Sequence, residues 1–411
     1  MTHGQQERKN LIFWFFASQC VTLFGSQIVQ MAVVWYVTLQ TNSGAWIAAF
    51  SVCSYLPQFF VSFIGGVWAD RYNRKRLILG ADLLIAAVTA MVALILPCMS
   101  TDSDLLGALL LMALIRSAGA GIQNPAVQAS IPLFVAKEEL THYNGIYAAM
   151  QAVVQFGAPA VAAVVMSMGT FRSALLMDVW TALIGVAMLA RVRFPGQGRA
   201  TAARSVLADI GEGIRYAYAR ATVAKTLMLY AAFVFFTVPA GYLAGLMVSR
   251  VFGDTYGYLT AVELVGFGGM LLGGLVMSRW SGFRARRRTL ALGLGVFGAM
   301  AIGMGISRRF VVYLICMALY GVSLTVVQTT LTTILQTCTQ SAMQGRVFGL
   351  MSSLYASCYP LGMALFGPLA DVFPIRWIMA LSGVVLMLSG VMAGRDRDFE
   401  SGIQEDPGDA G

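Results

Sequence analysis

Four charged side chains stand inside long apolar stretches of the sequence, where a charge is costly unless it has a partner or a function. They are Asp82, Arg116, Asp178 and Glu263. A carboxyl group in apolar surroundings can bind a proton and release it when water or a cation arrives. Asp178 and Glu263 are therefore our main candidates for groups whose protonation changes as the protein works. The alternative is that one or both hydrogen-bond to neighbouring hydroxyls and serve the structure only.

The other two charges allow two compatible interpretations. Arg116 and Asp82 lie on successive apolar stretches that would run antiparallel, so they could form a neutralising pair. Arg116 could also take part in moving protons. All four of these charged residues are therefore candidates for proton coupling.

Amide, hydroxyl and aromatic side chains also recur in these apolar stretches, and such groups can orient a bulky amphipathic molecule in a cavity. For the aromatics, ordinary helix packing is the alternative role, whereas an amide in hydrocarbon needs a partner. The candidate cavity residues are Gln19, Ser26, Gln27, Gln30, Met31, Gln151, Gln155, Phe233, Phe236, Tyr242, Gln328, Tyr355 and Tyr359.

The elements that carry these residues are expected to be transmembrane helices. Of the 411 residues, 58% are hydrophobic and only 11% are charged, and the mean hydropathy is +0.72. Soluble domains are roughly a quarter charged, so this composition excludes a soluble globular protein. We expect an all-α polytopic membrane protein with twelve spans, at about 11–39, 45–69, 77–98, 105–126, 143–168, 172–191, 226–249, 257–280, 289–306, 311–335, 347–369 and 375–394.

The basic residues indicate the orientation of these spans. The net charge of +9 comes from cations in loops, so it does not indicate nucleic-acid binding. With both termini in the cytoplasm, nearly all Lys and Arg residues fall on the cytoplasmic side, as basic loops do. Arg116 lies within a span, and the basic residues on the other side are Arg172, Arg250, Arg308, Arg309 and Arg376.

A long polar interval divides the spans into two sets of six. We expect an N-terminal bundle at 1–193, a cytoplasmic linker at 194–225, a C-terminal bundle at 226–394 and a cytoplasmic tail at 395–411. The apolar spacing at 205–216 favours a helix on the inner membrane surface or, equally, a solvated linker helix.

The loop between the second and third spans has a distinctive pattern: Gly66, Asp70, Arg71, Arg74 and Lys75. Gly66 would allow two helices to approach closely, and Asp70 could accept hydrogen bonds at the start of another helix. The pattern resembles the loop that marks the major facilitator superfamily, with Asn73 in place of a glycine. Asparagine also tolerates the left-handed conformation. The resemblance implies two six-helix bundles related by a pseudo-twofold axis, with a substrate site between them and a conformational role for the loop.

Two further stretches resemble motifs of this superfamily. Arg116 to Gly121 is similar to its fourth-span motif, although Gly119 stands three residues after the arginine instead of four, and Gly157 to Pro159 is a partial form of a fifth-span motif of drug–proton antiporters. Over nearly its whole length the chain resembles the macrolide-efflux branch, through stretches at 30–32, 80–83, 115–117, 124–126, 345–348 and 370–371.

This resemblance implies a monomeric exporter in the bacterial inner membrane that moves a bulky hydrophobic or amphipathic compound outward in exchange for protons. The proton gradient would be its energy source, so no cofactor is expected. A siderophore or metabolite exporter of the same fold is the alternative, since related exporters share several of these stretches. A receptor or scaffold derived from a transporter is the alternative from another class.

An enzyme is not expected. The sequence has no G-x-x-x-x-G-K-[ST] loop for ATP, and its spans offer no nucleophile–base combination. The six cysteines and two histidines are scattered without the spacing of a metal site, so we expect none.

Overall fold

The computed structural model describes residues 3–99, 102–135, 139–194, 214–280, 282–283, 285–340 and 343–396, and every regular element in these ranges is a helix. Two compact units divide the chain: residues 1–41 with 49–203, and residues 42–48 with 204–411. The helix predicted at 205–216 falls largely outside the described residues, of which 214–219 are helical.

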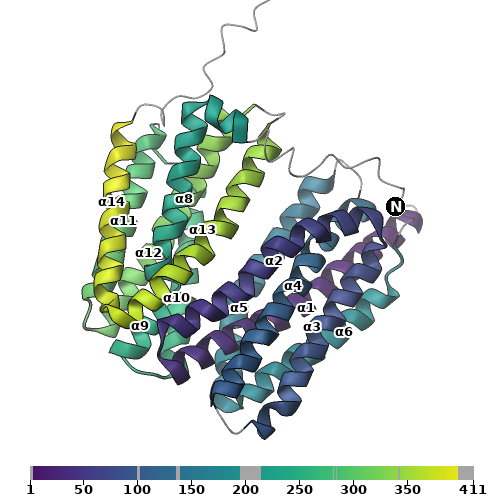
Figure 1. Cartoon of the computed structure of the whole chain (residues 1–411). Helices are drawn as coiled ribbons and strands as arrows, with labels where there is room; N and C mark the ends of the chain where they lie inside the picture. The colour runs from purple at the N-terminus through teal and green to yellow at the C-terminus, as the bar shows by residue number, and fades with distance from the viewer. Residues whose placement is uncertain are drawn as a thin grey trace, which may run out of the picture. The chain divides into compact units, whose positions relative to one another are not determined.

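Within the described residues, the first unit is formed mainly by six long helices and a 3-10 turn after α3, shown in purple to teal in Figure 1. Here α1 packs against α5 and α6, and α3 packs against α4 and α6. The elements are α1 (His3–Thr41), α2 (Gly44–Arg71), α3 (Arg74–Ile95), η1 (Leu96–Cys98), α4 (Asp102–Phe134), α5 (Leu140–Met168) and α6 (Phe171–Arg191).

The core of the first unit has an aromatic centre. The Phe134 ring lies 5.0 Å from both the Phe15 and the Phe194 rings, between centroids. Ile78 and Leu189 are buried in the same cluster. Because these rings belong to α1, α4 and the segment after α6, they join the ends of helices that are far apart in the sequence.

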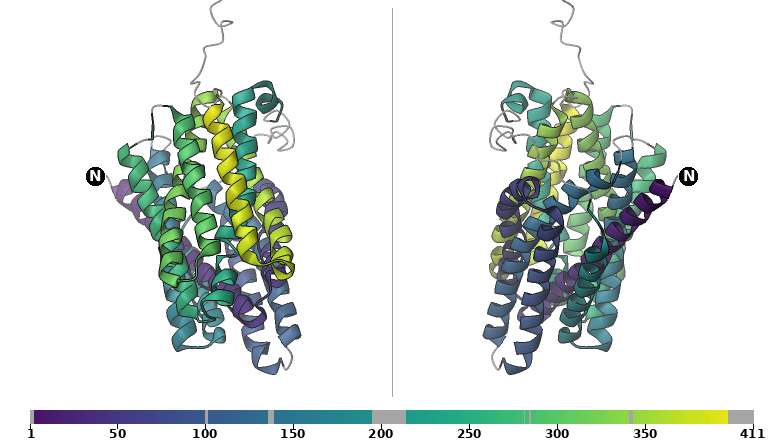
Figure 2. Two further views of the ribbon diagram at one scale, coloured as in Figure 1. Left: turned by 90° about the vertical axis from the view of Figure 1, so that its left-hand side faces the viewer. Right: turned by 90° about the vertical axis from the view of Figure 1, so that its right-hand side faces the viewer.

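The described part of the second unit contains, besides the helical residues 214–219, the helices α8 to α14, which Figure 2 shows from two sides. The yellow α14 runs beside α11, α10 and α11 both contact α12, and α13 packs on α8. The elements are α8 (Ala221–Gly241), α9 (Ala244–Val251), α10 (Tyr256–Trp280), α11 (Arg286–Ile306), α12 (Phe310–Cys338), α13 (Gln344–Val372) and α14 (Ile375–Arg395).

Eleven stretches of the described helices are long and apolar enough to cross a membrane. The one predicted span missing from these eleven is 347–369, which corresponds to α13; this helix has 29 residues but includes Ser, Tyr and two proline residues among its apolar positions. A polytopic helical membrane protein is therefore confirmed. The difference at α13 concerns hydropathy and not helix length.

The span predicted at 226–249 is not one helix. It consists of α8 and the short α9, separated by a turn at Tyr242 and Leu243. The N–H groups of both turn residues point to the Val238 carbonyl oxygen, at 2.9 and 3.2 Å. Pro239, which has no N–H, follows directly, so the regular hydrogen-bond ladder cannot continue unchanged through this stretch.

Residues 42–48, which start α2, belong to the second unit through a carboxylate at the end of α13. Asp371 accepts hydrogen bonds from the Ser43 hydroxyl at 2.6 Å and from the N–H groups of Gly44 and Ala45 at 2.7 and 2.8 Å. Arg250 forms an ion pair with Asp371 at 2.7 Å. A carboxylate that holds free N–H groups at a helix start stabilises that start, so Asp371 fixes where α2 begins.

Candidate functional site

A cavity of about 300 Å³ lies within the first unit, between α1, α2, α4 and α5. Its walls combine amide, hydroxyl and phenol groups with aliphatic side chains. Among the described residues that line it, Arg116 is the only charged one. The polar lining residues are Gln19, Thr22, Ser26, Gln27, Gln30, Ser54, Tyr55, Gln58, Ser117, Gln123, Asn124, Tyr147 and Gln151.

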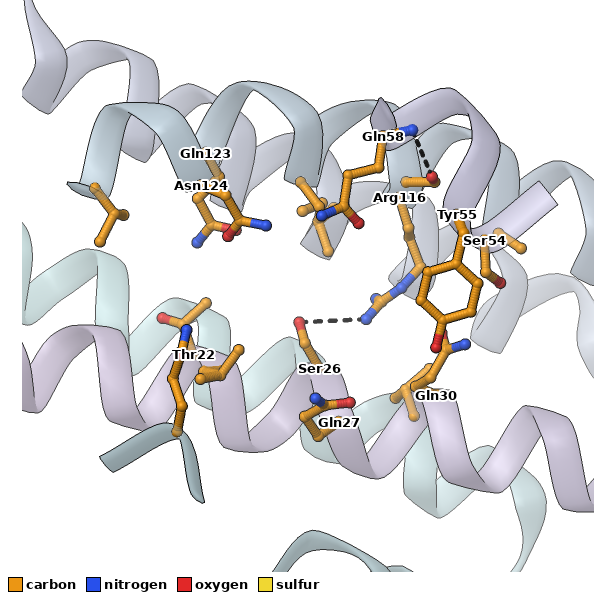
Figure 3. A pocket seen from close by; sticks show the side chains of 18 of the residues that line it. Thr22, Ser26, Gln27, Gln30, Ser54, Tyr55, Gln58, Arg116, Gln123 and Asn124 are labelled. Carbon is orange, nitrogen blue, oxygen red and sulfur yellow. Dashed lines mark hydrogen bonds between the residues drawn. The ribbon is translucent and has the colours of Figure 1, made fainter. Parts of the chain in front are cut away.

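Figure 3 shows how these groups face one another across the cavity. Ser26, Gln27 and Gln30 project from α1 on one side. Arg116 extends from α4 toward Ser26, and Gln123 and Asn124 occupy the same helix farther along. With the polar side chains of α2 and α5, groups from four helices therefore surround a space whose remaining walls are apolar, as in sites for amphipathic small molecules.

Asp178 lies behind this wall and forms an ion pair with Arg116. The Asp178 residue is fully buried, whereas the Arg116 side chain keeps 11% of its surface exposed. The Ser26 hydroxyl lies 3.3 Å from Asp178 Oδ1, and the Thr89 hydroxyl lies 3.2 Å from Oδ2. Arg116 also donates to both hydroxyls, so four helices, α1, α3, α4 and α6, contribute to one network.

Small residues on α1 and α6 bring Asp178 within reach of this network. A Cβ atom on Gly25 would overlap the Thr181 hydroxyl and lie 3.2 Å from Asp178 Cα. One turn farther along the crossing, a Cβ atom on Gly185 would overlap the Thr22 hydroxyl. The two helix backbones can approach this closely only because glycine occupies both positions.

The structure corrects the predicted partner of Arg116. Its guanidinium pairs with Asp178 on α6, not with Asp82 on α3. Asp82 instead receives a hydrogen bond from the Gln123 amide at 2.5 Å. The reason is the register of two antiparallel helices, which places Arg116 beside Thr89 and Gln123 beside Asp82. The alternative expectation, hydrogen bonds from hydroxyls to the carboxylate, describes Asp178 correctly.

Glu263 belongs to the second unit, on α10. It is half-buried, and no hydrogen bond or ion pair joins it to another described residue. The structure therefore brings together Asp178 and Arg116, and it places Asp82 of α3 beside Gln123, on the same helix as Arg116.

The predicted cavity residues divide in the same way. Gln19, Ser26, Gln27, Gln30 and Gln151 line the cavity, whereas Met31 and Gln155 do not.

The remaining six belong to the second unit. There Phe233 is buried against Phe297, and Gln328 is exposed. The Tyr355 ring stacks on the Tyr359 ring at 5.4 Å, and Tyr242 meets Tyr359 edge-on at 6.2 Å, while Phe236 packs against Phe366.

Sequence reasoning missed several lining residues, among them Tyr55, Gln58, Gln123 and Asn124. The three amides carry the same signal that identified the glutamines of α1, an amide within an apolar run. Gln58 has a further tie, because its backbone N–H donates to the Ser117 hydroxyl at 2.9 Å (Figure 3). That bond joins α2 to α4 at the cavity wall.

The cations of the loop between α2 and α3 bind backbone carbonyl groups at helix ends. Arg74 donates to the Ala69 and Ala129 oxygens at 2.8 and 2.6 Å. Lys75 donates to the Ala190 and Val192 oxygens at 2.7 and 2.9 Å. Ala69 and Ala190 lie in the last turns of α2 and α6, where carbonyl groups lack partners within the helix, so the two cations connect these ends, and the last third of α4, to the start of α3.

Other expectations for this loop need correction. A Cβ atom on Gly66 would meet no described atom within 4 Å, whereas one on Gly65 would overlap the Gly121 carbonyl oxygen of α4, so Gly65 makes the close approach. Asn73 has φ −66° and caps α3 through its side chain, which accepts from the Arg76 N–H, and so is not left-handed. Arg71 is exposed, and the Asp70 side chain lies outside the described part of the chain.

Comparison with known proteins places this architecture in a family. The family model of the Major Facilitator Superfamily matches residues 15–359. Macrolide efflux protein A of Streptococcus pyogenes is 27% identical over 387 residues, which cover 92% of this chain and 94% of that protein. The multidrug efflux pump Tap of Mycolicibacterium fortuitum is 24% identical over 379 residues, covering 90% and 91%.

The same fold is found among solved structures. A bacterial homologue of the iron transporter ferroportin, in an inward-facing state, aligns with a TM-score of 0.71 at 15% identity and covers 94% of this chain and 99% of its own. At that identity the likeness concerns the fold only. The helical architecture and the match over most of the sequence agree with the predicted resemblance, and the chain belongs to the Major Facilitator Superfamily of membrane transporters.

Proposed function

We propose that this protein exports a bulky amphipathic compound, of the kind that macrolide and multidrug efflux proteins carry, in exchange for protons. The observation that carries the proposal is the buried Asp178–Arg116 ion pair at the wall of an amide-lined cavity. The named relatives support an efflux role, and the cavity suits an amphipathic molecule.

Proton coupling follows from the unequal positions of the two partners. Asp178 is enclosed, and Arg116 lines the cavity. While Asp178 is ionised, the pair has no net charge. When Asp178 binds a proton, the Arg116 charge is uncompensated at the cavity wall and repels a cation held there. Binding of a proton and of a cationic amphiphile therefore oppose each other, which is the requirement for exchange.

The Arg116 charge that is left when Asp178 binds a proton also allows an anionic class of substrate to be tested. An uncompensated guanidinium attracts anions, and bidentate binding of carboxylates and similar groups is its usual chemistry. An exporter of an anionic siderophore would therefore bind best with Asp178 protonated, opposite to an exporter of cations. We favour cationic substrates because exchange with protons requires that binding of a proton and binding of the substrate oppose each other.

The charge pattern of the loops supports an orientation in the inner membrane with both termini cytoplasmic. A proton from the outside would then reach Asp178 when the site opens outward, and the compound would leave on the same side. Glu263 is a separate candidate for proton binding in the second unit, without the ion pair that supports Asp178.

Transport by purified protein in liposomes tests the proposal. An imposed proton gradient should drive a cationic macrolide, with erythromycin as the probe, against its concentration gradient, and Asp178→Asn should abolish this uphill movement. Asp104→Asn, which changes an exposed acid at the start of α4, is the matched control and should transport normally.

Substrate-for-substrate exchange without a gradient separates coupling from binding. Asp178→Asn should keep measurable exchange. Full gradient-driven transport by Asp178→Asn would contradict the assignment, and gradient-driven transport of an anionic catecholate siderophore but not of erythromycin would favour the second substrate class.

A further inference from the structure

Asp82 is a second buried carboxyl group. Because Arg116 pairs with Asp178, Asp82 has no described cation as its partner. Asp82 belongs to α3 and is buried inside the first unit, with only 1% of its surface exposed. Its Oδ1 atom receives the Gln123 amide at 2.5 Å, and its Oδ2 atom has no hydrogen-bond partner among the described residues. An ionised carboxylate in this position would keep its charge without compensation.

The charged groups on the neighbouring helices do not supply that compensation. On α4, which packs against α3, Arg116 is engaged by Asp178. On α6, the other helix packed against α3, Asp178 is a second acid and is engaged by Arg116. At the start of α3 itself, Arg74 and Lys75 bind carbonyl oxygens of other helix ends. Asp82 therefore has the Gln123 amide as its hydrogen-bond partner, and no described cation forms an ion pair with it.

Asp82 and Asp178 belong to two polar layers across the seam between α3 and α4. Thr89 stands seven residues after Asp82 on α3, and Gln123 stands seven residues after Arg116 on the antiparallel α4. Seven helical residues rise by about 10 Å, so the layers are separated by two turns. One layer contains Thr89, Arg116 and Asp178, and the other contains Asp82 and Gln123.

An apolar contact fills the space between the two layers. A Cβ atom on Gly119 of α4 would lie 2.9 Å from Ile85 Cγ1 on α3. The helices are thus already in tight contact there. Gln123, in contrast, lines the cavity while it binds Asp82, so it is the link between Asp82 and whatever the cavity holds.

We propose that Asp82 and Gln123 form a second proton-binding site, in which Asp82 is a neutral carboxylic acid in this conformation. The proton resides on a carboxylate oxygen of Asp82, and no bond other than O–H forms or breaks when it binds. Gln123 fixes the acid and transmits contact with the substrate. The role of this proton in transport rests on the proposed function, but its presence does not.

Infrared difference spectroscopy of the purified full-length protein tests this site without any substrate. A protonated carboxyl group has a C=O stretch that is distinct from those of carboxylates and amides. At neutral pH the wild-type protein should show this band, and Asp82→Asn should lose it. Asp178→Asn is the control that changes the acid of the other layer, and it should keep the band. An unchanged band in Asp82→Asn, or the absence of any such band in the wild-type protein, would overturn the proposal.

A second variant keeps the test decisive if Asp82→Asn does not fold. In Gln123→Leu the acid loses its hydrogen bond, so its band should shift in frequency, and carbon-13 labelling of aspartate should shift the same band. A band that responds to the label but not to Gln123→Leu would contradict the site. Because no transport is measured, a failure of gradient-driven export would leave this result standing, and the two failures are distinguishable.

Discussion

Arg116 and Asp178 differ in what they can contact, and that difference gives each a separate role. Asp178 contacts protein groups only, through Ser26, Thr89 and the guanidinium. Arg116 contacts the same groups and also the cavity. A buried ion pair of this kind contributes little net stability by itself, but leaving one partner alone is strongly destabilising.

A double-mutant cycle at the pair should therefore be strongly non-additive. Arg116→Met or Asp178→Leu alone leaves a buried charge without its partner and should destabilise the protein by about 3–5 kcal/mol. The double variant removes both charges and should be more stable than either single variant. Thermal unfolding in detergent measures this, and losses that simply add would show that the pair is not coupled in the folded protein.

At the scale of helices, close crossings decide which side chains meet. The α1–α6 crossing at Gly25 and Gly185 carries Asp178 to the network, and the N-terminus of α2 is fixed by the carboxylate at the end of α13. The sequence shows glycines and charges but not which helices are neighbours. For that reason the sequence predicts Asp82 of the adjacent span as a partner of Arg116, where the structure has Asp178, and it predicts Gly66 as the close contact, where Gly65 makes it.

Gly25→Ala should separate α1 from α6. The added methyl group overlaps the Thr181 side chain, and such overpacking costs about 1–3 kcal/mol. Gly107→Ala on α4 is the matched control, because its Cβ would meet no described atom within 4 Å. Thermal unfolding should show a lower midpoint for Gly25→Ala and an equal or higher one for Gly107→Ala. Equal midpoints for both variants would show that the crossing tolerates the added group.

Asp371 should give the second unit an acid-sensitive contact. This residue lies beyond the span predicted at 347–369. Partial burial opposes its ionisation, but hydrogen bonds from Ser43, Ala45, Gly44 and Arg250 outweigh that effect and lower the pKa of Asp371 from 3.8. Since its pKa is lower in the folded state, the ionised carboxylate stabilises the fold at pH values above its ordinary pKa. This contribution is lost as the pH falls through the lowered pKa.

The corresponding measurement is the difference in thermal unfolding between the wild-type protein and Asp371→Asn as a function of pH. The wild-type protein should be more stable at neutral pH, and the difference should shrink as the pH falls below 3.8. Asp254→Asn, at an exposed acid of the same unit, is the control and should show no such trend. A difference that is constant or grows toward acid would contradict the role of Asp371.

For the whole molecule, the number and position of the helices were predictable because a bilayer fixes the length of a span and hydropathy reveals it. The exceptions have local causes: Pro239 precedes the break between α8 and α9, and polar residues lower the hydropathy of α13. The cavity was only partly predictable. Amides on α1 were recognised, but which helices face α1 depends on packing that no single helix encodes.

The orientation of the whole chain is also testable. In a Cys98→Ser background, Asp104→Cys should react with a membrane-impermeant maleimide on intact cells, because α4 is expected to begin on the outer side. Arg76→Cys, at an exposed position of the cationic loop, should react only after the cells are permeabilised. The opposite pattern would reverse the proposed orientation.

The most direct test of the account is whether a substrate gradient alone moves protons. In liposomes with the same pH on both sides, an erythromycin gradient imposed across the wild-type protein should drive protons in the direction opposite to the drug, seen with a pH-sensitive dye. Asp178→Asn should carry erythromycin down its gradient without proton movement. Erythromycin transport by the wild-type protein without any proton movement, or proton movement that Asp178→Asn leaves intact, would contradict the claim that Asp178 and the cavity exchange a proton for a substrate.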